Sequence, residues 1–314
     1  MRKLAGAIGL LIALMVPAAA RADGPPVGGW TTAVAAGPFR YIALATGHAT
    51  ILERVAPGDG RVLSYRYLGR QVGIPRVALD GSGGGLSADG KTLVLSGPRT
   101  GYPARRSTLY FINPRTLALA GVLHLKGDFS FDAIAPDGAT IYLIQLSPRD
   151  PTRYAVRALD TATGRLYPKP VVDAREPDEP MRGSPMTRAT SVDGALAYTL
   201  YSGGDETFIH ALDTMHRQAA CIDIPPIRNL GQVHLAVNGH EVTVLNNGTP
   251  VAYVNTATRK VSKAPPATPP PAVSDGRGGG GGLPLWPFLA AAAAGLAGVT
   301  ALGARRRRAG SART

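Results

Sequence analysis

The sequence has a single cysteine, few aromatic residues and no acidic residue near either end. Because Cys221 stands alone among 314 residues, an intrachain disulfide and a cysteine-based zinc cluster are both excluded. Acidic residues occur only between Asp23 and Asp275, whereas eight of the 34 basic residues lie in the first 22 and the last ten positions. The net charge of +13 is therefore concentrated at the ends. The middle of the chain shows no basic cluster, which argues against nucleic-acid binding.

The motifs of the common enzyme classes are also missing. The chain has no Gly-x-Ser-x-Gly elbow, phosphate-binding loop, His-Glu-x-x-His or Gly-x-Gly-x-x-Gly after a strand. His234, His240 and Glu241 are near one hairpin, but neighbouring strand residues point to opposite faces, so at most one of the last two lies on the side of His234. Asp128 and Asp132 are a second candidate, as paired carboxylates. We expect neither a metal nor a cofactor, and we expect that the protein is not an enzyme.

Residues 1–22 have the pattern of a secretory signal peptide. Arg2 and Lys3 precede an apolar stretch that runs from Leu4 to Ala20, and Ala20-Arg21-Ala22 provides small residues at the positions a signal peptidase requires. The alternative, an uncleaved membrane anchor, stays open. Either interpretation predicts that residues 23–263 are extracytoplasmic.

The C-terminal part predicts a tethered protein. Residues 264–282 are rich in proline and then glycine, which is typical of an extended stalk with a flexible joint. Residues 283–304 carry no charge and are long enough to cross a bilayer. The basic tail, residues 305–314, predicts a cytoplasmic C-terminus. Sortase anchoring is disfavoured, because the sequence before the span lacks the Thr-Gly of that signal.

The region between these ends contains five copies of one sequence repeat. The first half of the repeat is an alternating strand, an Asp-Gly or Asn-Gly turn and a second alternating strand, a strong signal for a β-hairpin. Its copies are Leu86–Leu95, Ile134–Leu143, Thr190–Thr199 and Leu235–Val244, with a weaker copy at Val34–Ala43 that lacks the Asp or Asn. The second half is an apolar strand that ends in a turn opened by Asp or Asn, whose side chain can bind the backbone two residues later. Its copies are Tyr110–Thr116, Ala158–Gly164, Ala211–Arg217 and Tyr253–Arg259, preceded by a degenerate first copy at Val55–Gly60.

Four strands per unit and a period near 50 residues predict the blades of a β-propeller. A single four-stranded sheet cannot cover both of its faces, so each blade must pack on the next. Helical periodicity with capping signals is missing throughout this region. The sequence thus predicts an all-β fold of five four-stranded blades over residues 23–263, followed by one C-terminal transmembrane helix.

These two segments resemble the repeats of YVTN-type and surface-layer β-propeller proteins, a WD40-like class. The resemblance covers about residues 30–263 and departs from the class in the first copy and at Asn113-Pro114. It implies the propeller fold, often with seven blades in that class, against five here. Because the class includes lactonase-like and quinoprotein-like enzymes, the resemblance also implies an alternative function, catalysis at the central channel.

The longer and more varied loops of such a fold emerge on one face, where function on a repeated scaffold is usually found. They contain arginines that could bind an anionic group bidentately, together with one tyrosine and two aspartates. The candidate binding residues are Arg99, Tyr102, Arg105, Arg106, Asp128, Arg149, Arg153, Arg182, Asp205 and Arg228.

The sequence therefore predicts a binding or interaction module at the cell surface. It would be a single-pass protein of the cell membrane, held by residues 283–304. We expect its partner to be an extracytoplasmic protein or a ligand of the cell envelope, and no nucleic acid.

Overall fold

The computed structural model describes residues 29–36, 38–150, 153–179, 181–203 and 206–263. All of them belong to one compact unit. The predicted signal peptide, stalk, membrane span and basic tail lie outside these residues. Within the described residues, no helix is long and apolar enough to span a bilayer. The secondary structure there consists of strands and one short 3-10 helix, η1 (Leu230–Gln232), so the predicted all-β fold is confirmed.

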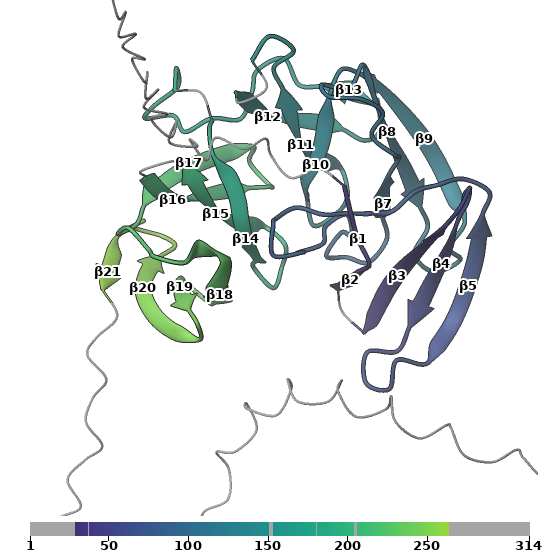
Figure 1. Cartoon of the computed structure of the whole chain (residues 1–314), viewed down its shortest axis with the longest axis horizontal. Helices are drawn as coiled ribbons and strands as arrows, with labels where there is room; N and C mark the ends of the chain where they lie inside the picture. Colours follow the sequence, from purple (N-terminus) through teal and green to yellow (C-terminus); the bar gives the residue numbers. More distant parts are fainter. Residues whose placement is uncertain (1–28, 37, 151–152, 180, 204–205, 264–314) are drawn as a thin grey trace, which may run out of the picture. The chain divides into compact units, whose positions relative to one another are not determined.

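Apart from a two-stranded sheet of β1 (Trp30–Thr31) and β6 (Ile74–Pro75), the strands form five antiparallel sheets in which neighbours in sequence are neighbours in the sheet (Figure 1). The first sheet contains β2 (Ala33–Ala36), β3 (Phe39–Thr46), β4 (Ala49–Val55) and β5 (Val62–Leu68). The second sheet contains β7 (Leu93–Ser96), β8 (Arg106–Ile112) and β9 (Leu119–Lys126). The third sheet contains β10 (Phe129–Ile134), β11 (Thr140–Leu146), β12 (Tyr154–Asp160) and β13 (Arg165–Leu166). The fourth sheet contains β14 (Ser184–Thr190), β15 (Leu196–Gly203), β16 (Glu206–Asp213) and β17 (Gln218–Asp223). The fifth sheet contains β18 (Val233–Asn238), β19 (Glu241–Asn246), β20 (Thr249–Asn255) and β21 (Val261–Lys263).

The turns within each sheet have the geometry that the repeat predicts. Gly90, Gly138, Gly194 and Gly239 all have positive φ, between 55° and 75°, which glycine adopts without steric cost. At the second turn the opening Asp or Asn accepts backbone hydrogen bonds, as in the 2.8 Å bond from the Thr163 amide to Asp160 Oδ1. The sequence therefore specified both hairpins of the repeat through local chemistry.

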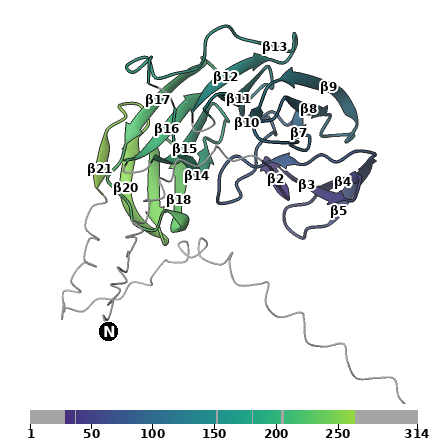
Figure 2. The same ribbon diagram turned by 45° about the horizontal axis from the view of Figure 1, so that its top comes forward.

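Packing between neighbouring sheets forms the core. Four clusters of buried side chains join the first sheet to the second, the second to the third, the third to the fourth and the fourth to the fifth. Figure 2 shows the fifth sheet alongside the fourth, where Leu200, Val244 and their neighbours are buried together. No cluster among the described residues joins the fifth sheet to the first. Sheets of consecutive strands packed in series make a β-propeller type of fold.

The second sheet differs from the prediction, because it has three strands instead of four. Where an inner strand was expected from Leu86, only an isolated bridge joins Leu86 to Leu93. The preceding residues are Gly83, Gly84 and Gly85, and Gly85 has a φ of +100°. A regular strand cannot include such a conformation, so the inner strand is reduced to one bridge.

The same glycine-rich segment links distant sheets. We call residues 76–86 the strap. They follow β6 (Ile74–Pro75), which pairs with β1 (Trp30–Thr31). The amides of Leu79 and Asp80 donate hydrogen bonds of 2.9 and 3.1 Å to the carbonyl oxygens of Pro185 and Met186 in β14. The strap therefore connects the region of the second sheet to the fourth sheet without using the third.

Candidate functional site

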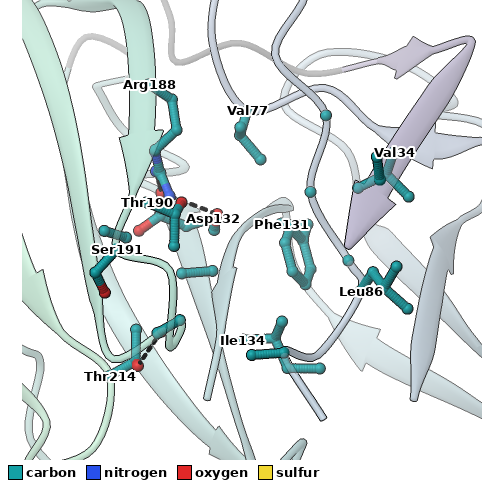
Figure 3. A pocket seen from close by; sticks show the side chains of 18 of the residues that line it. Val34, Val77, Leu86, Phe131, Asp132, Ile134, Arg188, Thr190, Ser191 and Thr214 are labelled. Atoms are coloured by element: carbon teal, nitrogen blue, oxygen red, sulfur yellow. Dashed lines mark hydrogen bonds and ion pairs between the residues drawn. The ribbon is translucent and has the colours of Figure 1, made fainter. Parts of the chain in front are cut away.

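A cavity of about 280 Å³ lies among the first strands of the sheets and the strap. Its described lining comes mainly from β2, the strap, β10, and β14 with the turn that follows it (Figure 3). Ala88, Ala197 of β15 and Thr214 after β16 complete it. The cavity lining includes Val34, Val77, Gly84, Gly85, Leu86, Phe131, Asp132, Ile134, Arg188, Thr190, Ser191 and Thr214. A volume close to 300 Å³ is at the lower end of the range for small-molecule sites, about 300–1,000 Å³.

One wall of the cavity is polar and contains a buried ion pair. The Arg188 guanidinium of β14 binds Asp132 of β10 twice, through Nη2 to the carboxylate Oδ1 and through Nη1 to the backbone carbonyl, the second at 3.0 Å. The two side chains are only 7% and 4% exposed. Figure 3 shows them beside Thr190, with the arginine reaching from its strand toward the aspartate. A buried pair in direct contact is compatible with two ionised groups.

The ion pair leaves two of its own polar atoms unused. Asp132 Oδ2 and Arg188 Nε are buried and have no hydrogen-bond partner among the described residues. Unpartnered buried polar atoms are costly, so such atoms in a native protein usually indicate a bound water or ligand, or a functional role. By contrast, the hydroxyls of Ser191 and Thr214 are used within the fold, in bonds to Asp193 Oδ1 and to the Gly194 carbonyl oxygen.

The opposite wall is apolar. Val34, Val77, Leu86, Phe131 and Ile134 lie together on this side, away from the ion pair (Figure 3). The strap approaches this wall so closely that only glycine fits. A Cβ on Gly84 would lie 2.7 Å from Phe131 Cε1, and one on Gly85 would lie 2.3 Å from the Val94 carbonyl oxygen. The cavity thus has one hydrogen-bonding side and one apolar side.

The Asp-Gly turns of neighbouring sheets meet beside the cavity. The Asp89 amide donates a 3.0 Å hydrogen bond to the Pro136 carbonyl. A Cβ on Gly194 would lie 2.8 Å from the Ala88 Cβ, and both of these residues line the cavity. The repeated turn therefore has a second role beyond reversing the chain, since three of its copies pack on one another.

A buried aromatic and histidine group lies in the fourth sheet and adjoining β12. Tyr201 of β15 packs against Tyr154, Phe208 and the edge of His210, with ring centroids 5.4–6.2 Å apart. Burial lowers the pKa of His210 to about 4, and the nearby Asp132 only partly opposes this effect. His210 is therefore neutral at physiological pH. Burial also raises the pKa of Tyr201 well above its usual value.

Three of the residues predicted from the loops form a single group. Arg99 Nη2 lies 2.5 Å from Asp128 Oδ2, which also accepts a 2.7 Å hydrogen bond from the Ala104 amide. The Arg99 guanidinium stacks over the Tyr102 ring at 4.9 Å. Asp128 and Asp132 thus bind different arginines, Arg99 and Arg188, and do not form the paired carboxylates that the sequence allowed.

The other predicted residues are placed separately. Arg105 and Arg106 are exposed at the start of β8, and Arg149, Arg153, Arg182 and Arg228 are exposed at other positions. Some of them take part in hydrogen bonds through backbone atoms, such as the 3.0 Å bond from Tyr154 Oη to the Arg182 carbonyl. Asp205 lies outside the described residues. Within the described part of the chain, no three His, Cys, Asp or Glu side chains are grouped so that they could hold a metal ion.

From the sequence, the central channel was only the site of the alternative function implied by the resemblance, and Asp132 was the one cavity residue considered for a chemical role. Arg188 was not singled out, because its partner is 56 residues away and no local motif joins them. The feature of the sequence that could have indicated the cavity is the run Gly83-Gly84-Gly85. Consecutive glycines before a strand indicate a close approach of the backbone to other elements, and here they line the cavity.

Comparisons with known proteins place the chain in no family. No protein-family model matches its sequence, and no curated protein does. Membership of the YVTN-type or surface-layer class therefore stays a prediction.

Several solved structures are similar to this one. They include a Kuenenia stuttgartiensis hydrazine synthase (17% identity, 74% of this chain and 69% of that one, TM-score 0.44). A second is an oligogalacturonate lyase in complex with manganese (13% identity, 75% and 64%, TM-score 0.46). A third is TolB from Acinetobacter baumannii (13% identity, 76% and 52%, TM-score 0.39). The fold assignment rests on the sheet topology and core clusters, because likeness at this level assigns no particular function.

The expectation that the protein is not an enzyme is corrected by these comparisons. The similar structures include enzymes, a hydrazine synthase and a lyase, beside TolB. The error has a physical reason, since function resides in side chains placed on a fold and one fold hosts many unrelated functions. The absence of a familiar sequence motif therefore does not exclude catalysis here.

Proposed function

We propose that the protein is an exported β-propeller of five blades that binds a small molecule in its central cavity. The observation that carries the proposal is the buried Asp132–Arg188 pair, which keeps a carboxylate oxygen and a guanidinium N–H unpartnered beside the cavity. A ligand that offers a donor next to an acceptor, such as an alcohol or an amide, would satisfy both atoms.

The size and the walls of the cavity define the ligand further. The ion pair is neutral overall, so the ligand needs no charge of its own. The apolar wall formed by Val34, Val77, Leu86, Phe131 and Ile134 matches a compact hydrocarbon or ring portion. The proposed ligand is a small, neutral, amphipathic molecule.

The proposed location follows from the chain ends. Residues 1–22 direct export, residues 264–282 form a stalk, and residues 283–304 hold the protein in the cell membrane with residues 305–314 in the cytoplasm. The loop face with Arg105, Arg106 and Arg149 would contact an extracytoplasmic partner or the cell envelope. A chain that ends after Lys263 should then be released from the membrane fraction into the extracytoplasmic medium, as measured by fractionation and immunoblotting. A truncated chain that stays with the membrane would contradict the tether.

A panel of small amphipathic alcohols and amides tests the binding function, with ligand-observed NMR on the full-length protein in detergent micelles. Thr190 lines the cavity and is exposed, so Thr190→Tyr should block the cavity with little effect on folding. Ala120 is exposed on the outer strand β9, which makes Ala120→Tyr a matched control. Compounds that bind the wild type and Ala120→Tyr, but not Thr190→Tyr, would support the proposal. Equal binding to all three proteins would refute it.

Catalysis in the same cavity is the second candidate. It is favoured by the position of a carboxylate, Asp132, among the inner strands. The compounds that bind can be incubated with the protein and followed by mass spectrometry. A product formed by the wild type and lost in Asp132→Asn would establish an enzyme, whereas unchanged compounds would leave binding as the function.

A further inference from the structure

The chain contains six asparagines, all of them among the described residues, and two of the six precede a glycine. These are Asn238, followed by Gly239, and Asn247, followed by Gly248. The backbone nitrogen that follows an asparagine can attack the carbon of the side-chain amide and expel ammonia. Glycine favours this attack, because it has no side chain to obstruct the approach and its backbone is the least restricted. The two Asn-Gly pairs are therefore candidate sites of a spontaneous modification.

Both pairs lie at exposed turns of the fifth sheet. Asn238 ends β18 opposite Glu241 of β19, and Asn247 and Gly248 form the two-residue turn between β19 and β20. The φ angles of Asn247 and Gly248 are +49° and +76°, as in the type I′ hairpin turn, for which Asn-Gly is a preferred pair. A Cβ at Gly239 or at Gly248 would meet nothing within 4 Å. The backbone at both glycines can therefore rotate without a collision.

The reacting groups of these two pairs are not held by the fold. The side chains of Asn238 and Asn247 are exposed and make no hydrogen bond to another described residue. The amides of Gly239 and Gly248 donate no hydrogen bond within the same part of the chain. The side-chain amide and the attacking nitrogen can therefore meet without breaking an existing interaction.

The other four asparagines are held or obstructed. The Oδ1 atom of Asn255 accepts three hydrogen bonds, among them one of 2.8 Å from the Thr258 amide, and the next residue carries a side chain. Asn113 precedes a proline, which has no N–H. Asn246 donates a 3.1 Å hydrogen bond to a backbone carbonyl through Nδ2. Asn229 precedes a leucine. The fold and the sequence thus single out the same two positions.

We propose that Asn238 and Asn247 are sites of spontaneous deamidation in the folded protein. The glycine nitrogen loses its proton and bonds to the side-chain Cγ, the Cγ–Nδ2 bond breaks, and ammonia leaves with that proton. Water then opens the five-membered succinimide that results. Cleavage between Cγ and the glycine nitrogen gives aspartate, and cleavage between the backbone carbonyl carbon and that nitrogen gives isoaspartate. No oxidant or reductant is needed.

The modification at Asn247 weakens the fifth sheet. Isoaspartate adds one carbon atom to the backbone, and turn length fixes the register of the two strands that a hairpin joins. Ala252 and Val254 of β20 are buried in the core cluster between the fourth and the fifth sheet. A change of register in β20 would move these side chains out of the cluster. The expected result is faster local opening of β20.

The test is peptide mapping by mass spectrometry of the full-length protein in nonionic detergent, incubated at neutral and at mildly alkaline pH. Asn255 in the same digest is the internal control. We expect Asn238 and Asn247 to convert at least tenfold faster than Asn255, and faster at the higher pH, because the deprotonated glycine nitrogen is the nucleophile. A parallel incubation in urea measures any protection by the fold. The rates in buffer should lie within tenfold of those in urea.

Asn247→Gly is the matched variant, because glycine keeps the positive φ of the turn and removes the reacting amide. Hydrogen exchange of β20 should accelerate at least tenfold in wild-type molecules that carry isoaspartate at position 247. It should stay constant in Asn247→Gly over the same incubation. The proposal is overturned if the folded protein converts Asn238 and Asn247 no faster than Asn255, or more than a hundredfold more slowly than the protein in urea. Unchanged exchange of β20 after conversion would refute the weakening of the fifth sheet.

Discussion

At the scale of single residues, the ion pair between Asp132 and Arg188 is the central feature of the molecule. Removing one partner of a buried pair leaves an uncompensated charge and typically costs about 3–5 kcal/mol, whereas a complete pair often adds little net stability. The pair is thus a weak way to hold a fold together. Its unpartnered atoms beside a cavity are better explained by recognition of a ligand.

Buried His210 makes stability depend on pH. The folded protein keeps His210 neutral down to about pH 4, whereas the unfolded chain takes up a proton near pH 6.5. The free energy of unfolding should therefore be constant above pH 6.5, fall as the pH drops toward 4, and level off below. The loss should be at most about 3 kcal/mol, from about 1.36 kcal/mol per pKa unit. Urea unfolding at several pH values measures it.

His210→Gln provides the control for this prediction, because it removes the titrating ring. The groups whose charges act on His210 are Asp132, Arg188 and Asp173. The Arg175 guanidinium holds the pKa of Asp173 well below its usual value of 3.8. The contribution of the ionised Asp173 carboxylate to stability is therefore lost only at a pH below the range in which His210 affects stability. A slope between pH 6.5 and 4 that persists in His210→Gln would assign the pH dependence to other groups.

Residue-scale prediction from the sequence succeeded where the chemistry was local. The Asp-Gly turns and the Asx turns depend on residues two or three apart, and they were placed correctly. Arg188, by contrast, acquires its role from Asp132, which is brought close only by the packing of two sheets. No pattern along the chain encodes such a contact.

At the scale of secondary-structure elements, the strap is an irregular segment that lines the cavity. Its glycines permit contacts that a side chain would prevent, and its amides bind the edge of β14. The repeat correctly predicted nearly all the other strands, because alternation and turn residues agree along each copy. It failed at the inner strand of the second sheet, where the glycines override the strand pattern.

Gly85→Ala should destabilise the protein by at least about 2 kcal/mol. An alanine there would adopt a strained φ of +100°, with its Cβ 2.3 Å from the Val94 carbonyl oxygen. Gly58→Ala is the control, because a Cβ at Gly58 meets nothing within 4 Å and should change stability by less than about 0.5 kcal/mol. Chemical unfolding of both variants measures the difference. Equal stability of the two variants would show that the strap is not packed as described.

At the scale of the whole molecule, the sheets are stabilised mainly by their neighbours in the series. The second, third and fourth sheets each take part in two core clusters, whereas the first and the fifth take part in one. The first sheet also leaves Tyr65 and Tyr67 exposed, at 73% and 66%. In a repeat architecture of this kind, stability is close to a sum of contributions from single units and their interfaces.

Hydrogen exchange should therefore be fastest in the terminal sheets. We expect amides of β3 and β19 to exchange earlier than those of β11 and β15, because local opening of a terminal sheet breaks one interface instead of two. Exchange followed by mass spectrometry on peptides resolves the four strands. Uniform protection across all five sheets would indicate an additional contact that joins the fifth sheet to the first.

The organisation of the whole chain could be predicted only in part. The spacing of the repeat was sufficient to predict the all-β fold, because each copy forms one sheet that must pack on the next. The lining of the central cavity was not predictable, because it is formed by residues from three different sheets and the strap. The export signal, stalk and membrane span remain predictions from composition, and the function of the loop face remains a proposal.

The most direct test of a ligand site in the central cavity is a calorimetric titration of the tightest compound from the amphipathic panel into the full-length protein. We predict one site per chain in the wild type and in Ala120→Tyr, with affinity reduced more than tenfold in Thr190→Tyr and in Asp132→Asn. A compound that binds all four proteins with the same affinity would contradict the assignment of the cavity and its ion pair as the binding site.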